Sequence, residues 1–244
     1  MTRVLIAMFD GAQTLDVTGP AEVFATASRG AARELYRVVV ASIGGGVRAT
    51  SCGVRLETAD LARIRPKKDD VVIVAGGPDA PIRAAVGDAT LIAWVRRAGR
   101  VVRVLASVCS GAFVLGAAGV LDGRRAATHW SACARLARAF PRATVDSNAI
   151  FVRDGDVWTS AGVTTGIDMA LAMVEADHGR GLADDIAARL VLYVRRPGYQ
   201  SQWSEALVAQ TEGDSELAPA IAWARGNLAR ADVETLAARA ALSV

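Results

Sequence analysis

The feature that most constrains this chain is the alternation of short apolar runs with segments of helical periodicity. The apolar runs are rich in β-branched residues and occupy residues 4–9, 36–42, 71–75, 101–107 and 126–129. Such runs predict strands that are buried on both faces of a parallel sheet, with the intervening helices covering that sheet. The sequence therefore predicts an α/β fold in which a mostly parallel sheet is sandwiched by helices.

Further signals extend this domain. Asp154-Gly155 lies between two apolar runs and predicts a β-hairpin, so we expect one antiparallel pair beside the parallel strands. A helical pattern covers residues 164–178, and a second one covers residues 182–194. We place the end of the main domain at residue 194, so that residues 1–194 form a ligand-binding domain.

The remainder of the chain has a different character. Residues 195–216 begin as a polar, turn-rich stretch, which we interpret as a linker. Residues 217–244 predict two short helices, the second with Asp232 as its N-cap, and a following turn. This order is how a helix-turn-helix begins, but the recognition helix that would enter the DNA groove is missing. The alternative is a helical hairpin that packs on the main domain.

Composition narrows the class of protein. A chain of 244 residues, 52% hydrophobic and 22% charged, can bury one large core. No run approaches the length needed to cross a bilayer, and the first residues lead directly into a strand pattern, so we expect a cytoplasmic protein without membrane contact. The net charge of +3 leaves nucleic acid open as a partner, although the arginines are spread along several helices and form no block, so the charge alone does not decide the partner.

Cysteine and histidine usage argues against a metal site. The 3 cysteines are far apart in sequence and lack Cys-x-x-Cys spacing, and the chain has only 2 histidines. This pattern fits neither a disulfide framework nor a zinc site. We expect no metal and no cofactor. Cys52 and Cys133 fall outside every motif, and His178 ends a helix, so we assign these three residues no chemistry.

Cys109 is the candidate reactive group. It stands where an apolar strand-like run gives way to small residues and then to a helical run, over residues 103–116. In such a strand-turn-helix corner the side chain lies above the helix N-terminus, where unpaired amides favour an anion. We therefore expect its thiol to ionise more readily than a free cysteine. The alternative is a small buried residue that fits a tight turn and is chemically inert.

Several motifs, taken together and in order, resemble the ThiJ/PfpI branch of the class I glutamine-amidotransferase-like superfamily. They occupy residues 14–24, 75–78, 108–113, 121–130 and 158–168. The resemblance implies a flavodoxin-like fold. The tail, residues 195–200 and 217–244, is similar to the linker and first helices of AraC-type transcriptional regulators that carry such a domain as a sensor. Isonitrile hydratase, an enzyme of the same branch, resembles the main domain nearly as well.

The resemblance places Cys109 at a nucleophile elbow, with Asp16 pointing toward its sulfur. A carboxyl group there can accept the thiol proton or donate a hydrogen bond to the thiolate. Asp16 also suits the start of a helix, and the two roles are compatible. His129 follows at the end of the next predicted strand, where several members of the superfamily carry a histidine. The alternative for His129 is a satisfied histidine at a strand end.

The remaining candidate residues would surround the ligand. The amides of Gly77 and Ser110 would form an oxyanion or anion pocket, because Gly77 ends a buried strand and Ser110 opens a helix. Gly162, Val163 and Thr164 open a long helix and would close the pocket from the opposite side. A tight turn and an ordinary helix entry would explain these residues equally well.

Two functions follow as hypotheses. The first is a regulatory protein that senses a small molecule beside Cys109 and Asp16, acts as a homodimer and reaches DNA only through the missing recognition helix. The second is an isonitrile hydratase that uses Cys109 as its nucleophile. A glyoxalase or chaperone role usually goes with glutamate at the position of Asp16, and PfpI-type peptidases carry histidine where Ser110 stands, so we discount both.

Overall fold

The computed structural model describes residues 1–29, 34–203 and 218–241. Contacts divide the chain into two compact units, Met1–Gln202 and Trp203–Val244. Most of the predicted linker, residues 204–216, lies outside the described residues, as do residue 217 and the predicted final turn at residues 242–244.

The first unit is built on an eight-stranded sheet with the order β3-β4-β2-β1-β5-β6-β10-β9. Its strands are β1 (Thr2–Ala7), β2 (Tyr36–Ser42), β3 (Gly46–Ala49), β4 (Arg55–Asp60), β5 (Val71–Val74), β6 (Val104–Val108), β9 (Phe151–Asp154) and β10 (Val157–Ser160). All neighbours pair in parallel except β3 with β4 and β9 with β10. The predicted α/β class with a mostly parallel sheet is confirmed.

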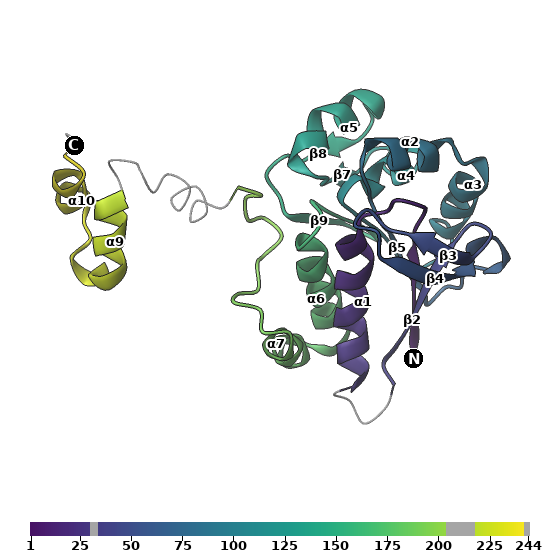
Figure 1. The fold of residues 1–244 in the computed structure, drawn as a ribbon, viewed down its shortest axis with the longest axis horizontal. Coiled ribbons are helices and arrows are strands. Elements are labelled where there is room, and N and C mark those ends of the chain that lie inside the picture. The colour runs from purple at the N-terminus through teal and green to yellow at the C-terminus, as the bar shows by residue number, and fades with distance from the viewer. Residues whose placement is uncertain (30–33, 204–217, 242–244) are drawn as a thin grey trace. The chain divides into compact units, whose positions relative to one another are not determined.

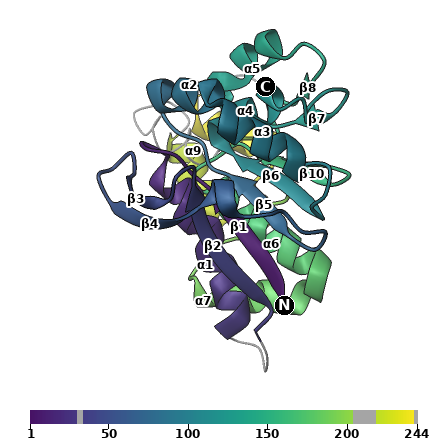
Figure 2. The same cartoon turned by 90° about the vertical axis from the view of Figure 1, so that its right-hand side faces the viewer.

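Helices cover both faces of this sheet (Figures 1 and 2). Helices α1 (Thr14–Arg29) and α6 (Thr165–His178) lie side by side on one face, with α7 (Arg180–Arg189) against them. The other face carries α2 (Asp79–Gly87), α3 (Ala89–Ala98) and α4 (Ala112–Ala117), which contact one another. Short elements complete the unit: the 3-10 turns η1 (Leu61–Arg63), η2 (Cys109–Gly111) and η3 (Trp130–Ala132), and the helix α5 (Cys133–Ala139).

Burial explains which strands the sequence predicts well. β5 and β6 are buried along their whole length, and their alternate residues enter two separate clusters, one under each layer of helices. Residues of this kind give the continuous apolar runs that predict central parallel strands. β3 and β4 lie at the edge of the sheet, mostly exposed and with charged side chains, so no apolar run predicts them.

The predicted hairpin is confirmed. One of its strands lies beside β6, where the sequence predicts residues 126–129. β9 and β10 form an antiparallel pair, and β10 pairs in parallel with β6. The prediction that residues 126–129 continue the main sheet is wrong. Only Arg125–Ala126 are extended, as strand β7, and they pair with β8 (Thr144–Val145) in a separate two-stranded sheet. The four buried residues of β10 fill the place beside β6 instead.

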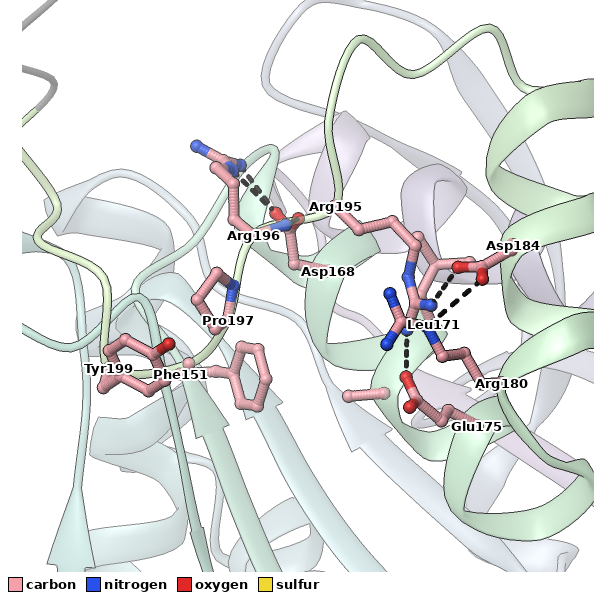
Figure 3. Close-up of a pocket in the computed structure, with 12 residues that line it drawn as sticks. Phe151, Asp168, Leu171, Glu175, Arg180, Asp184, Arg195, Arg196, Pro197 and Tyr199 are labelled. Atoms are coloured by element: carbon pink, nitrogen blue, oxygen red, sulfur yellow. Dashed lines mark hydrogen bonds and ion pairs between the residues drawn. The ribbon is translucent and has the colours of Figure 1, made fainter.

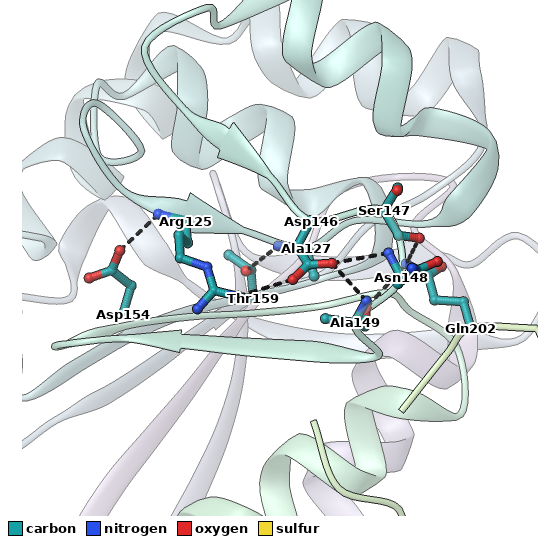
Figure 4. Close-up of polar contacts among 9 residues, drawn as sticks. All are labelled: Arg125, Ala127, Asp146, Ser147, Asn148, Ala149, Asp154, Thr159 and Gln202. Atoms are coloured by element: carbon teal, nitrogen blue, oxygen red, sulfur yellow. Dashed lines mark hydrogen bonds and ion pairs between the residues drawn. The ribbon is translucent and has the colours of Figure 1, made fainter. Parts of the chain in front are cut away.

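The chain leaves this unit along its surface. Helix α7 ends at Arg189, earlier than the predicted limit of residue 194. The next residues, which we call the exit segment (residues 195–202), contact the α/β domain although the sequence predicts them as the start of a linker. At its end the Gln202 side-chain amide donates to the carbonyl oxygens of Thr128, Ser147 and Ala149 at 3.1, 3.3 and 3.2 Å. Figure 4 shows Gln202 beside Ser147 and Ala149.

The second unit contains two short helices, as the tail pattern predicts. They are α9 (Ala218–Gly226) and α10 (Val233–Arg239), joined by the 3-10 turn η4 (Leu228–Arg230). The Asp232 carboxylate accepts a hydrogen bond from the Thr235 amide at 2.7 Å, so Asp232 is the N-cap of α10. The Arg239 guanidinium lies 3.9 Å from the centre of the Trp223 ring, which holds the two helices together.

Among the residues described, no helix is both long and apolar enough to span a bilayer.

We predict that Gly111→Ala destabilises the domain by about 1–3 kcal/mol, because an added methyl group overpacks a closed site. A Cβ at this position would lie 2.4 Å from the Val74 carbonyl oxygen at the end of β5. Gly87→Ala is the matched control, since its Cβ would meet nothing within 4 Å, and we expect it to be neutral or slightly stabilising. Urea unfolding measures both, and equal stabilities would contradict the prediction.

Candidate functional site

Cys109 follows β6 directly, at the carboxyl edge of the sheet. Its backbone has φ +55°, a left-handed conformation that is rare for residues other than glycine, and the turn η2 begins with it, ahead of α4. The side chain is only partly exposed because Gly162 covers it. Gly162 has φ +116°, and a Cβ there would lie 2.4 Å from the Cys109 Cβ and 2.8 Å from its sulfur. This position therefore requires glycine.

Asp16 joins three segments that are distant in sequence. It lies in the first turn of α1 and is fully buried. One carboxylate oxygen accepts a hydrogen bond from the Gly76 amide at 3.0 Å, and the other accepts one from the Val163 amide at 3.0 Å. The side chain therefore holds the loops that follow β5 and β10, and these contacts leave the capping of α1 to other groups.

Burial disfavours the ionised form of both groups, and the Asp16 carboxylate further disfavours the Cys109 thiolate. Burial raises the pKa of Asp16 to about 6, and the hydrogen bonds from Val163 and Gly76 only partly oppose this rise. Burial and the nearby Asp16 carboxylate raise the pKa of Cys109 to about 12, against the opposing hydrogen bonds of Ser110. The expectation of a readily ionised thiol is therefore wrong, because desolvation and a like charge outweigh the amides of a short helix.

The predicted amide pocket is not open in this structure. The Gly77 amide donates to the Ser110 hydroxyl at 2.9 Å, and the same hydroxyl donates to the Gly77 carbonyl oxygen at 2.7 Å. These paired bonds tie the loop after β5 to the start of η2. Ser110 hydrogen-bonds to the Cys109 sulfur, whereas the Gly77 amide is already occupied by the Ser110 hydroxyl.

His129 occupies a different position from the one predicted. Because residues 126–129 do not continue the sheet, His129 precedes η3, where its Nδ1 lies 2.7 Å from the Ser131 hydroxyl. Partial burial lowers the pKa of His129. Its neighbour Thr128 makes the contact with the site, since the Thr128 hydroxyl donates to the Cys109 carbonyl oxygen at 2.8 Å.

The loop between β10 and α6 forms the opposite wall. Val163 has φ +48°, which is unusual for a β-branched residue, and its amide holds Asp16. The Thr165 hydroxyl accepts from the Gly162 amide at 2.7 Å and closes the turn. Thr164 faces away from this turn, where its hydroxyl accepts a hydrogen bond from Arg196 at 3.1 Å.

The structure thus brings Asp16, Cys109, Ser110 and Gly162 together, and places Gly77 beside them. Sequence reasoning placed Val163 in the wall of the pocket and Gly76 in the motif at residues 75–78, but it assigned neither of them, nor Thr128, to a hydrogen bond of this network. Their contributions come from a backbone amide or from a single hydroxyl, and Gly76 and Val163 lie 60 and 147 positions from Asp16. No local pattern marks such partners.

Two further observations concern the rest of the described chain. Within residues 1–29, 34–203 and 218–241, no group of three or more His, Cys, Asp or Glu side chains is arranged to hold a metal ion. Cys52 is exposed, and its sulfur lies 2.9 Å from the Thr14 hydroxyl. Hydrogen bonds from Thr14, Val54 and Thr50 lower the pKa of Cys52 to about 7.

Comparison with known families identifies the domain. The model of the DJ-1/PfpI family matches residues 2–176. The chain belongs to this family.

Its relatives include regulators and an enzyme. A protein of the cpoL 5' region of Streptomyces lividans is 45% identical over 141 residues, which cover 57% of this chain and 95% of that protein. The HTH-type transcriptional regulator CdhR of Pseudomonas aeruginosa is 36% identical over 169 residues, 69% of this chain and 49% of CdhR. Isonitrile hydratase of Pseudomonas putida is 31% identical over 194 residues, 80% of this chain and 79% of the enzyme. The chain thus spans about half the length of the regulator it matches.

Solved structures show the same fold. A ThiJ/PfpI family protein from Pseudomonas syringae superposes with a TM-score of 0.70 at 27% identity, covering 80% of this chain and 76% of that chain. An AraC family transcriptional regulator from Pseudomonas putida superposes with a TM-score of 0.62 at 22% identity, covering 78% of this chain and all of that chain (100%).

We predict that alkylation at pH 7.5 modifies Cys52 at least about 100-fold faster than Cys109, because the thiolate is the reactive species. Peptide mass spectrometry after timed exposure to iodoacetamide measures both rates. Cys52→Ser should remove the fast phase. Modification of Cys109 within the fast phase would contradict the raised pKa.

We predict a pH-dependent contribution from Asp16. Because its pKa rises on folding from 3.8 to about 6, the folded state holds a proton that the unfolded state loses, and this stabilisation disappears as pH rises from 4 to 7. The free energy of unfolding of the wild type should fall by about 2–3 kcal/mol relative to Asp16→Asn over this range. Asp69→Asn, which removes an exposed carboxyl group, is the control. A constant difference between wild type and Asp16→Asn would contradict the prediction.

Proposed function

We propose that this chain is the small-molecule-sensing region of an AraC-type transcriptional regulator, with its ligand site beside Cys109 and Asp16. The observation that carries the proposal is the alignment with CdhR, in which the DJ-1/PfpI domain of this chain matches about half of a helix-turn-helix regulator. A second helical unit follows the domain in this chain, as a regulator of this organisation requires.

The chemistry of the site supports recognition over catalysis. A thiol with a pKa of about 12 is neutral at physiological pH, so it offers a polar, polarisable contact and few thiolate anions. Asp16, with a pKa of about 6, changes charge close to neutrality and can pair with an amine or share a proton with an acid. The strained backbone of Cys109 has the form of a nucleophile elbow, and here it would present the sulfur to a ligand.

The tail supports the DNA-binding part of the proposal. Helices α9 and α10, with Asp232 as the cap of α10, match the first two helices expected of a helix-turn-helix. The recognition helix would follow them in sequence. A regulator of this type reads two half-sites, so we propose that it acts as a homodimer.

A second candidate is isonitrile hydration, which the alignment with the Pseudomonas putida enzyme favours. The Cys109 thiolate would attack the terminal isonitrile carbon, and Asp16 would deliver the proton that this carbon gains. Water would then add to the resulting thioimidate carbon, and loss of the thiolate would release an N-substituted formamide. Formamide production from an aryl isonitrile that is faster with the wild type than with Cys109→Ala would favour this candidate over the sensor.

We predict that a thermal-shift screen of small amines and carboxylic acids finds a compound that raises the melting temperature by about 2 °C or more, because binding to the folded state stabilises it. The shift should disappear in Cys109→Ala. Cys52→Ala is the matched control, since it removes an exposed cysteine outside the site, and the shift should persist there. A shift that is unchanged in Cys109→Ala would place the ligand elsewhere and contradict the proposed site.

A further inference from the structure

Arg196 is the strongest anchor of the exit segment on the domain. Its guanidinium donates two hydrogen bonds to one Asp168 carboxylate oxygen, at 3.1 Å from Nε and 2.6 Å from Nη2, and its backbone amide donates to the other oxygen at 3.0 Å (Figure 3). The Asp168 side chain is only 5% exposed. Its charge is therefore removed from water and depends on Arg196 for compensation.

The same guanidinium touches the wall of the Cys109 site. Arg196 Nη2 donates to the Thr164 hydroxyl at 3.1 Å, and Thr164 directly follows Val163, whose amide holds the Asp16 carboxylate. Gly162, the preceding residue, packs on the Cys109 sulfur. Three consecutive residues therefore contact the sulfur, the buried acid and the exit segment in turn.

We propose that Arg196 couples the Cys109–Asp16 site to the exit segment through the turn at residues 162–165. This inference rests on the proposed sensor function and supplies the route by which occupancy of the site would reach the chain beyond residue 202.

The conformation of Val163 is the physical reason that this turn can respond. A β-branched residue at φ +48° is strained, and such strain persists only where the surrounding contacts hold it. Here Asp16 holds the turn from inside the domain and Arg196 holds it from the exit segment. A ligand that draws Asp16 away from the Val163 amide would favour a relaxed turn and weaken the hold on Arg196. Because coupling between two sites acts in both directions, loss of the Arg196 contact would in turn perturb the turn and the site.

The adjacent arginine provides a matched control. Arg195 forms ion pairs with Asp184 of α7 and Glu175 of α6 (Figure 3). Neither of these partners lies in the turn at 162–165. Arg195→Ala therefore removes the same charge from the same segment and loosens the same anchor region, while the contacts of Arg196 remain.

The experiment uses the full 244-residue chain and needs no ligand. The rate of Cys109 alkylation by iodoacetamide at pH 9, followed by peptide mass spectrometry, reports on the site. Hydrogen exchange of peptides covering residues 162–168 and 195–202 reports on the turn and on the exit segment. The variants are Arg196→Ala, Arg196→Lys, Thr164→Val and Arg195→Ala, with Asp16→Asn for the reverse direction.

We expect Arg196→Ala to change the Cys109 alkylation rate by about threefold or more and to speed exchange at residues 162–168. We expect smaller changes of the same sign in two further variants. Arg196→Lys keeps the positive charge but loses the paired hydrogen bonds of the guanidinium, and Thr164→Val loses one hydroxyl contact. Arg195→Ala should speed exchange only at residues 195–202. Asp16→Asn tests the reverse direction, because this change within the site should also speed exchange at residues 195–202.

An alkylation rate that is unchanged in Arg196→Ala, or changed equally in Arg195→Ala, would overturn the inference. Should Arg196→Ala fail to fold, Arg196→Lys and Thr164→Val decide the matter by the same two readouts. The failure of this inference and the failure of the sensor proposal can be told apart. If Arg196 affects the site but no small molecule binds, only the sensor proposal fails. If a small molecule binds but Arg196 has no effect on the site, only the role of Arg196 is overturned.

Discussion

The site depends on one buried carboxylate. Asp16 accepts hydrogen bonds from the backbone amides of Gly76 and Val163. These bonds connect the loops after β5 and β10 to the first turn of α1. The two backbone amides donate to different oxygens of the side chain. A carboxylate provides two such oxygens, whereas an amide side chain provides one. The same burial that makes these bonds strong raises the pKa of Asp16 to about 6. Structural support and readiness to change charge are therefore properties of a single group.

The thiol is shaped by the same burial. A strained backbone at φ +55° holds Cys109 where β6 ends, and Gly162 covers the sulfur so closely that no side chain fits between them. In an open corner the amides of the next helix would favour a thiolate. In this closed one, desolvation and the charge of Asp16 raise the pKa of Cys109 to about 12. In this DJ-1/PfpI domain the cysteine therefore stands in a strained turn between strand and helix while its surroundings disfavour the thiolate.

The exit segment is the part of the domain through which we propose that the site acts. Residues 195–202 are polar and rich in turn formers, a pattern typical of a linker, yet Arg196 and Gln202 bind them to the domain. Hydrogen bonds to a buried carboxylate and to three carbonyl oxygens replace the apolar contacts by which helices normally dock. Polar contacts of this kind are separable without exposing a hydrophobic surface, which would suit the ligand-dependent change that we propose for this segment.

Sequence alone determined the α/β class, the hairpin, the helical tail with its Asp232 cap, and the placing of Cys109 and Asp16 in one site. These features depend on local periodicity, turn chemistry or motif resemblance, which neighbouring residues carry. Tertiary structure decided that β10 and not residues 126–129 lies beside β6, that His129 binds Ser131, and that the Cys109 thiol is hard to ionise. Strand neighbours and pKa values depend on which distant backbone groups and charges meet after folding, and short-range patterns carry no record of them.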